Sequence, residues 1–226
     1  MARRGPPGGR LPAVTVRSAR RRKPSSTRWL SRQLNDPYVA EARRLGYRSR
    51  AAFKLIELDQ RFRLLRPGQR VVDLGCAPGG WMQVAVARVG RHGMVVGIDL
   101  AATTPLPGTT VLSGDVCDPA TPAAISEALG GLADIVLSDM APAATGHAAT
   151  DHLRIVALAE DAFAVAAQIL RPGGAFVAKV FQGGAEGALL AELKRDFAEL
   201  RHVKPPASRA ESAETYVVAT GYRGGR

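Results

Sequence analysis

The sequence predicts an α/β domain with a mostly parallel, doubly wound sheet and one antiparallel strand late in the chain. Short apolar runs alternate with longer segments of helical periodicity along most of the 226 residues, a pattern typical of repeated strand–helix units. Glycine-rich breaks follow several runs, as at 75–80. The last two apolar runs lie close together, which indicates a late hairpin with an antiparallel strand.

Residues 1–25 are predicted to form a disordered basic arm, with residues 26–226 as a single domain. The arm mixes eight Arg or Lys residues with Gly, Pro and Ser and has no acid, so it cannot bury enough apolar surface to order itself. We expect it to hold phosphates without distinguishing base sequence. A dispensable solubilising tail is an open alternative, and a transit peptide is disfavoured by the Gly and Pro content.

The formal net charge of +11 favours a polyanionic partner, and nucleic acid is the usual one inside a cell. No apolar run reaches the roughly 18 residues that a membrane-spanning helix needs, and no secretory signal is present. Cys76 and Cys117 indicate neither a disulfide framework nor a metal site. We therefore expect a cytoplasmic, metal-free protein, without membrane contact and monomeric.

Residues 26–65 are predicted to be helical and to face RNA. Aromatic residues and arginines interleave there, which suits binding of the RNA backbone and stacking of bases. The set is Arg28, Trp29, Arg32, Tyr38, Arg43, Arg44, Tyr47, Arg48 and Arg50. Residues 49–58 predict a capped amphipathic helix that ends at 66–68, with Phe53, Ile56 and Leu58 facing the core and Lys54 on its edge.

The rest of the domain follows from apolar runs and the residues that interrupt them. Strands are predicted at 70–74, 94–99, 111–112, 134–139, 175–181, 201–204 and 215–221. Helices are predicted at 80–89, 119–129, 151–170 and 184–199. Asp118 is expected to cap the second of these helices, with Pro119 in its first turn.

The turn after the first strand is a candidate binding element. Its glycines are spaced G-x-x-x-G-G, whereas a dinucleotide fingerprint would need glycine at Ala77, and the turn carries no Lys or Arg for a phosphate. Asp99, Asp115 and Asp139 follow the next strands, at the sheet edge where ligands bind. An acid at Asp99 suits ribose hydroxyls, and one at Asp115 can reach a purine amine. This favours S-adenosylmethionine (SAM), whose sulfonium is cationic, over ATP.

Five ordered blocks resemble the FtsJ/RrmJ (RlmE) family of ribosomal RNA ribose 2′-O-methyltransferases. The match spans roughly residues 26–222. The blocks are Ser-Arg-Ala-Ala-Phe-Lys-Leu at 49–55, Asp-Leu-Gly-Cys-Ala-Pro-Gly-Gly-Trp at 73–81, Ser-Asp-Met-Ala-Pro at 138–142, Ala-Lys-Val-Phe at 178–181 and Ser-Ala-Glu-Thr-Tyr at 212–216. The resemblance implies a Rossmann-like, SAM-dependent methyltransferase fold. It also implies a substrate: a uridine in the A-loop of 23S rRNA, methylated in the assembled large ribosomal subunit.

The resemblance further implies the site residues. The catalytic tetrad falls on Lys54, Asp139, Lys179 and Glu214. The cofactor contacts fall on Gly79, Trp81, Asp99, Asp115 and Asp139. Trp81 could line the cofactor pocket or pack beneath the turn. Glu211 is a neighbouring acid, but the sequence around Glu214 matches the family block.

The residues themselves favour ribose over base as the target. Enzymes that act on exocyclic amines need an aromatic residue after the fourth strand to stack a flipped base, and here Met140 follows. Methylation at pyrimidine carbon needs a cysteine nucleophile, and neither cysteine is placed for it. An alcohol needs a base, and Lys179 is predicted to take the 2′-OH proton. Because lysine in water is mostly protonated at neutral pH, stabilisation of the developing alkoxide stays open as its role.

Lys54 would orient the target ribose or phosphate, and Glu214 the lysines. Two other functions stay open. A 2′-O-methyltransferase of tRNA or another RNA would share the same residues. A non-catalytic ribosome assembly factor could keep the fold, although the intact tetrad speaks against it.

Overall fold

A computed structural model describes residues 27, 30–31, 33–142, 145–181 and 187–224. The predicted basic arm lies outside these residues, as do Arg28, Trp29 and Arg32 of the predicted RNA-facing set. No helix in the described ranges is long and apolar enough to cross a membrane.

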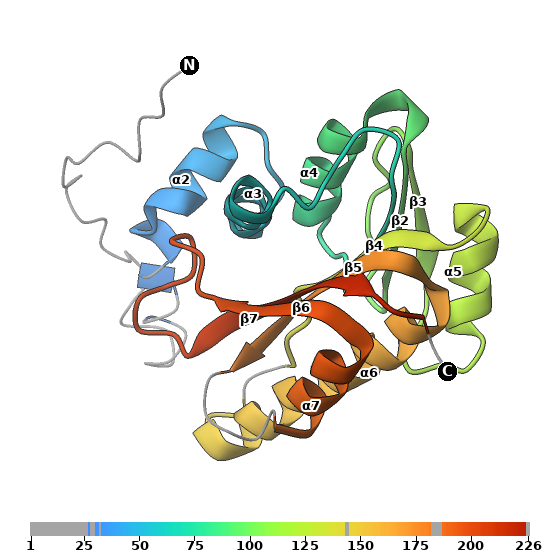
Figure 1. The fold of residues 1–226 in the computed structure, drawn as a ribbon. Coiled ribbons are helices and arrows are strands. Elements are labelled where there is room, and N and C mark those ends of the chain that lie inside the picture. The colour runs from blue at the N-terminus through green and yellow to red at the C-terminus, as the bar shows by residue number, and fades with distance from the viewer. Residues whose placement is uncertain (1–26, 28–29, 32, 143–144, 182–186, 225–226) are drawn as a thin grey trace.

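A seven-stranded sheet in the order β3-β2-β1-β4-β5-β7-β6 forms the centre of the molecule (Figure 1). The strands are β1 Arg70–Leu74, β2 Met94–Asp99, β3 Thr109–Ser113, β4 Ala133–Ser138, β5 Leu170–Phe181, β6 Phe197–Val203 and β7 Glu214–Tyr222. The strands β1 to β5 pair in parallel, and β7 is antiparallel to both of its neighbours, β5 and β6. The predicted sheet with one antiparallel late strand is confirmed.

Helices cover both faces of this sheet, as in a doubly wound fold. The helices are α2 Pro37–Arg44, α3 Ala51–Phe62, α4 Gly80–Val89, α5 Thr121–Leu129, α6 Ala148–Ile169 and α7 Gly187–Asp196, with a short 3₁₀ turn at Gly90–His92. Apolar side chains of α3 and α4 pack on one face of the sheet, and those of α5, α6 and α7 pack on the other (Figure 1).

The two-residue period of the strands decides which side chains reach the site. On β5, Phe176 and Ala178 pack toward α6, while Val177 packs with the α3 and α4 core. Lys179 lies two residues after Val177, so its side chain also points to the α3 face. On β7 the same period places Glu214 and Tyr216 on that face.

The helix predicted at 49–58 forms, but its orientation differs from the prediction. It buries Ala52, Lys54, Leu55, Leu58 and Asp59, whereas Phe53 and Ile56 are only half-buried. The difference arises because α2 packs on the Phe53 side of α3. The ring centroids of Tyr38 and Phe53 lie 5.3 Å apart. The helix ends at Phe62, with the left-handed residue Arg63 (φ 53°) following, rather than at 66–68. Lys54 is therefore buried and not on an edge.

Several element boundaries also differ: β5 begins at Leu170 rather than at 175, and α6 begins at Ala148 rather than at 151. Two further differences have a clear cause. The helix α5 begins at Thr121, because the Asp118 carboxylate accepts a hydrogen bond from the Ala120 N–H and closes a turn before the helix. The helix predicted to reach residue 199 ends at Asp196. Phe197 instead begins β6 and pairs with Tyr222 of β7, with their ring centroids 5.1 Å apart. Strand pairing there outweighs the helical periodicity of the sequence.

Candidate active site

The four predicted catalytic residues come together from four elements. Lys54 comes from α3, Asp139 follows β4, Lys179 lies on β5 and Glu214 begins β7. The Lys179 Nζ atom lies 3.1 Å from Oδ1 of Asp139 and donates to its main-chain oxygen at 2.8 Å. The Lys54 Nζ atom lies 3.3 Å from Oδ2 of Asp139 and 2.8 Å from Oε1 of Glu214. Two cations and two anions thus alternate in one cluster.

Burial explains why these charges need each other. The exposed fractions of Lys54 and Lys179 are 8% and 6%, and a buried charge is tolerated when it is paired and hydrogen-bonded. Burial alone would raise the pKa of the Asp139 carboxyl, but Lys179, Lys54 and a hydrogen bond from Tyr216 outweigh it, and the pKa lies below its ordinary value. Asp139 is therefore a carboxylate at neutral pH.

Tyr216 belongs to the cluster, although the sequence analysis gave it no role. Its hydroxyl lies 2.6 Å from Oδ1 of Asp139 and 3.3 Å from Oε1 of Glu214, and its ring lies under the Lys54 ammonium. It is fully buried and pairs with Lys179 across β5 and β7. Burial, then Asp139 and Glu214, raise its pKa well above the ordinary value, so the phenol stays protonated and donates. Tyr216 lies two residues after Glu214 on a strand, and residues at this spacing share one face of the sheet. This spacing could have indicated from the sequence that Tyr216 lies beside Glu214.

The glycine turn between β1 and α4 is shaped by its backbone. Gly75 and Gly79 have φ of 75° and 104°, in the left-handed region that favours glycine. A Cβ on Gly80 would lie 2.3 Å from the Ser49 hydroxyl. The Ala77 N–H donates to the Asp99 carboxylate at 2.8 Å. The turn and the end of β2 are thus fixed against each other at the N-terminus of α4, where the first main-chain N–H groups have no partner within the helix and can bind a ligand.

Carboxyl groups gather at this edge of the sheet. Asp99 is half-buried, and Asp115 is exposed in the loop after β3, where it accepts from the Cys117 N–H at 2.9 Å. Asp73, at the end of β1, is an acid that the sequence analysis did not select. It is 1% exposed, and its Oδ2 atom has no hydrogen-bond partner among the described residues. Burial, then Asp139 and Asp99, raise the pKa of Asp73 well above the ordinary value. Such a set suits a ligand with cationic groups and hydroxyls.

The expectation of a turn without a nearby cation needs correction. The Arg48 guanidinium lies across Gly79, with Nη1 2.7 Å from where a Cβ would be. It donates to the main-chain oxygens of Pro78, Thr104 and Pro105. Arg48 therefore connects the loop after β2 to the turn through carbonyl groups, and these contacts give it a structural role.

Trp81 lies behind the turn. Its side chain is 3% exposed, its indole N–H donates to the Ala51 oxygen at 2.8 Å, and its ring lies 5.9 Å from that of Tyr216. Of the two roles left open for this side chain, the structure shows packing. A cofactor contact through the main chain of Trp81 stays a prediction.

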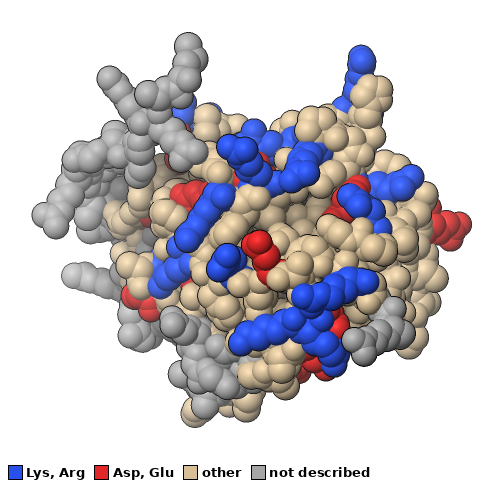
Figure 2. All heavy atoms as spheres, in the orientation of Figure 1, with Lys and Arg blue, Asp and Glu red and all other residues tan. Residues whose placement is uncertain are grey.

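In the N-terminal helical region, the aromatic rings are packed whereas arginines at the end of α2 are exposed. The rings of Tyr38 and Tyr47 both pack on Phe53, 5.3 and 5.7 Å away, so they are engaged within this layer. Arg43 and Arg44 end α2 with exposed side chains. Figure 2 shows Lys and Arg gathered over the part of this face where α3 and α4 lie in Figure 1. The RNA-facing role of residues 26–65 stays a prediction, with arginine as its better-placed component.

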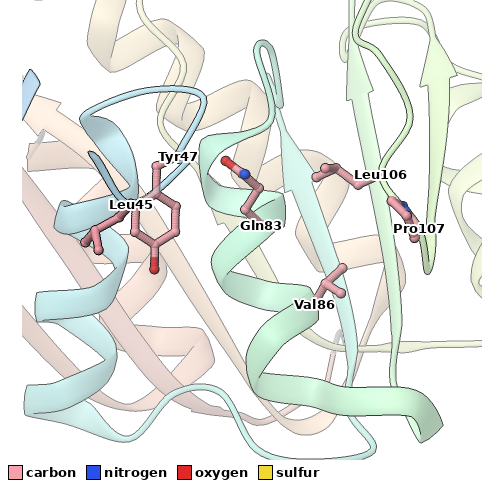
Figure 3. A pocket seen from close by; sticks show the side chains of 6 residues that line it. All are labelled: Leu45, Tyr47, Gln83, Val86, Leu106 and Pro107. Atoms are coloured by element: carbon pink, nitrogen blue, oxygen red, sulfur yellow. The ribbon is translucent and has the colours of Figure 1, made fainter. Parts of the chain in front are cut away.

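A pocket of about 310 Å³ lies beside α4 (Figure 3). Leu45, Tyr47, Gln83, Val86, Leu106 and Pro107 line it. None of the predicted catalytic or cofactor residues is among them, and we assign the pocket no chemistry. Among the described residues, no group of three or more His, Cys, Asp or Glu is placed to hold a metal ion.

The sequence profile of the FtsJ-like methyltransferases matches residues 47–222, which contain all of the predicted catalytic and cofactor residues. The chain belongs to the FtsJ-like methyltransferase family. This FtsJ-like chain is 62% identical to the ribosomal RNA large subunit methyltransferase E of Paramagnetospirillum magneticum, over 97% of its own length and 93% of the relative's. It is 60% identical to the protein of the same name from Acidiphilium cryptum, over 95% and 94%.

A solved structure from Plasmodium falciparum, described as a ribosomal RNA methyltransferase, is also similar to this FtsJ-like chain. The TM-score is 0.72 at 30% identity, and the match covers 79% of this chain and all of the other. The predicted family and methyltransferase fold are therefore confirmed.

Proposed function

We propose that this FtsJ-like methyltransferase transfers a methyl group from SAM to the ribose 2′-OH of a uridine in the A-loop of 23S rRNA, on the assembled large subunit. The observation that carries the proposal is the paired cluster of Lys54, Asp139, Lys179 and Glu214 at the ligand-binding edge of the sheet. The names of its relatives support rRNA of the large subunit over tRNA. We further propose that the protein acts in the cytoplasm as a monomer.

The residues around the turn fit SAM. The partnerless Asp73 oxygen offers a hydrogen-bond acceptor, and a cationic ligand would stabilise the ionised forms of Asp73 and of the carboxyls beside it. Gly79 lets the backbone approach closely. Asp99 would hold the ribose hydroxyls, Asp115 the adenine amine and Asp139 the methionine end, while main-chain groups at the start of α4 would contribute at Trp81. Bound SAM supplies an electrophilic methyl carbon.

Lys179 is the residue proposed to contact the 2′-oxygen. Two acceptors on Asp139 fix its Nζ atom. We propose that Nζ first gives one proton to solvent and, as the neutral amine, takes the 2′-OH proton while the oxygen bonds to the methyl carbon and the sulfur–methyl bond breaks. Lys54 is held between Asp139 and Glu214, where an ammonium can orient the ribose or its phosphate. Holding both groups in place lowers the entropy cost of the reaction.

The substrate is tested by mapping ribose methylation in large-subunit rRNA from a strain that lacks this protein. We expect an unmethylated A-loop uridine, restored by the wild-type chain and not by Lys179→Ala. A normally methylated A-loop in the deletion strain would contradict the proposed substrate. Methylation lost at another ribose would keep the reaction and change the site on the RNA.

A further inference from the structure

A closed ring of contacts joins α3 to loop 204–213, which connects β6 to β7. Oε1 of Glu214 lies 2.8 Å from the Lys54 ammonium and accepts a hydrogen bond from the Ser208 hydroxyl at 2.9 Å. The preceding residue, Ala207, donates its N–H to Oε2 of Glu57 at 2.7 Å. Glu57 is three residues after Lys54, so both lie on one side of α3. The helix α3 therefore contacts both the tetrad residue Glu214, through Lys54, and the loop, through Glu57.

The main chain around Ser208 is fixed on both sides. The Ala207 carbonyl accepts from Arg50, and the Ser208 N–H donates to the Pro205 oxygen at 2.8 Å. Asp36, which precedes α2, pairs with Arg50 at 2.9 Å and with Arg209 at 3.2 Å. Ser208 itself is 6% exposed. Its hydroxyl is thus held in one direction, toward Glu214, with little access for water to replace it.

The Glu214 carboxylate has few donors that could set its rotation. A glutamate side chain has several rotatable bonds, and a single contact with an ammonium leaves its rotation loosely defined. Tyr216 lies 3.3 Å away but is closer to Asp139, at 2.6 Å, and donates its one hydroxyl hydrogen there. Among the described residues, Ser208 and Lys54 are the donors within 3 Å of this oxygen.

We propose that Ser208 is a positioning residue of the tetrad, which orients Glu214 and, through it, the Lys54 ammonium. This inference rests on the proposed function. Because Ser208 contacts a tetrad side chain and none of the predicted cofactor residues, it acts on the rate of methyl transfer and not on the affinity for SAM. Nothing in its own chemistry takes part in the reaction.

The first test is steady-state methyl transfer to large subunits by full-length Ser208→Ala. We expect kcat to fall about tenfold, with the KM for SAM and the melting temperature close to wild type. The matched control is Ser212→Ala, in the same loop. The Ser212 hydroxyl accepts from the main-chain N–H of Glu214 at 3.1 Å and does not hold its carboxylate, so kcat should stay within about twofold. Equal losses in both variants would mean general loop disorder and would overturn the proposal.

The second test is a double-mutant cycle with Glu214→Ala, which removes the oxygen that accepts from Ser208. If Ser208 acts through Glu214, Ser208→Ala should change kcat by less than about twofold in the Glu214→Ala background. Urea unfolding of the same four proteins gives the coupling even where turnover is too low to measure. Additive effects in both measurements would overturn the proposal.

These outcomes distinguish a failure of the Ser208 proposal from a failure of the proposed function. Loss of activity in Glu214→Ala with full activity in Ser208→Ala removes the role of Ser208 and leaves the proposed function standing. Absence of methyl transfer by the wild-type chain, on large subunits and on naked 23S rRNA, contradicts the proposed function itself.

Discussion

The ammonium of Lys179 is held by two oxygens of a single residue, Asp139: Oδ1 at 3.1 Å and the main-chain oxygen at 2.8 Å. The main-chain contact ties the lysine to the backbone at the end of β4, so its position depends on the sheet as well as on the side chain of Asp139. With Lys54 on the other carboxylate oxygen, Asp139 becomes the centre of the site.

The glycine turn gives a prediction about cofactor affinity. Gly79→Ala places a side chain at φ 104° and against Arg48, so the turn must shift, and we expect the Kd for SAM to rise about tenfold or more. Isothermal titration calorimetry measures it. The control is Gly130→Ala after α5, where φ is 64° and a Cβ meets nothing within 4 Å. That variant should lose about 1 kcal/mol of stability and keep its affinity. Unchanged SAM binding in Gly79→Ala would contradict the assignment of the turn.

Asp115 and Asp118 offer a matched pair. Each carboxylate accepts the N–H two residues further on, from Cys117 and from Ala120, both at 2.9 Å. Truncation to alanine removes the same local contact in both cases. We expect Asp115→Ala to raise the Kd for SAM by about tenfold, because only Asp115 is assigned to the adenine amine, and Asp118→Ala to leave it unchanged. Equal effects on SAM binding would mean that Asp115 supports the loop alone.

Asp73 gives a prediction about pH and stability. Its folded-state pKa is raised well above the ordinary value by burial and by Asp139 and Asp99. Between about pH 4, the ordinary aspartate pKa, and the raised pKa, the folded protein binds one more proton at this group than the unfolded chain. The contribution of Asp73 to stability therefore falls as pH rises through that window.

The variant Asp73→Asn removes this titration. The free energy of unfolding, measured with urea from pH 4 to pH 7, should fall less steeply with pH, or rise more steeply, than in the wild type. The difference between the two curves isolates Asp73 from the other titrating groups. Parallel curves for the variant and the wild type would show that Asp73 does not carry the extra proton.

The parts of the fold set by local pattern could be predicted from the sequence. The first two strands and the helix after the glycine turn match their predicted bounds, 70–74, 94–99 and 80–89, because apolar runs there end at Asp and Gly residues. The boundary between α7 and β6 could not be found this way, since Phe197 joins the sheet through contacts with Tyr222, far along the chain.

Some residues of the site could likewise be predicted from the sequence and others could not. The four tetrad residues could be placed by resemblance, and the structure brings them into contact. Three contributions depend on contacts that no local pattern reveals. Arg48 reaches Pro78 and Thr104 across 30 and 56 residues, the orphaned oxygen of Asp73 depends on what surrounds β1, and Ser208 meets Glu214 because α3 holds their loop.

The most direct measurement is methyl transfer from labelled SAM to large subunits by Lys179→Ala and Lys179→Arg, with SAM affinity measured on the same samples. We expect both variants to bind SAM as the wild type does and to lose at least about a hundredfold in kcat, because neither side chain can take the 2′-OH proton. Near-wild-type turnover in Lys179→Ala would contradict the assignment of Lys179, and turnover restored by arginine would show that the site needs a fixed positive charge rather than a base.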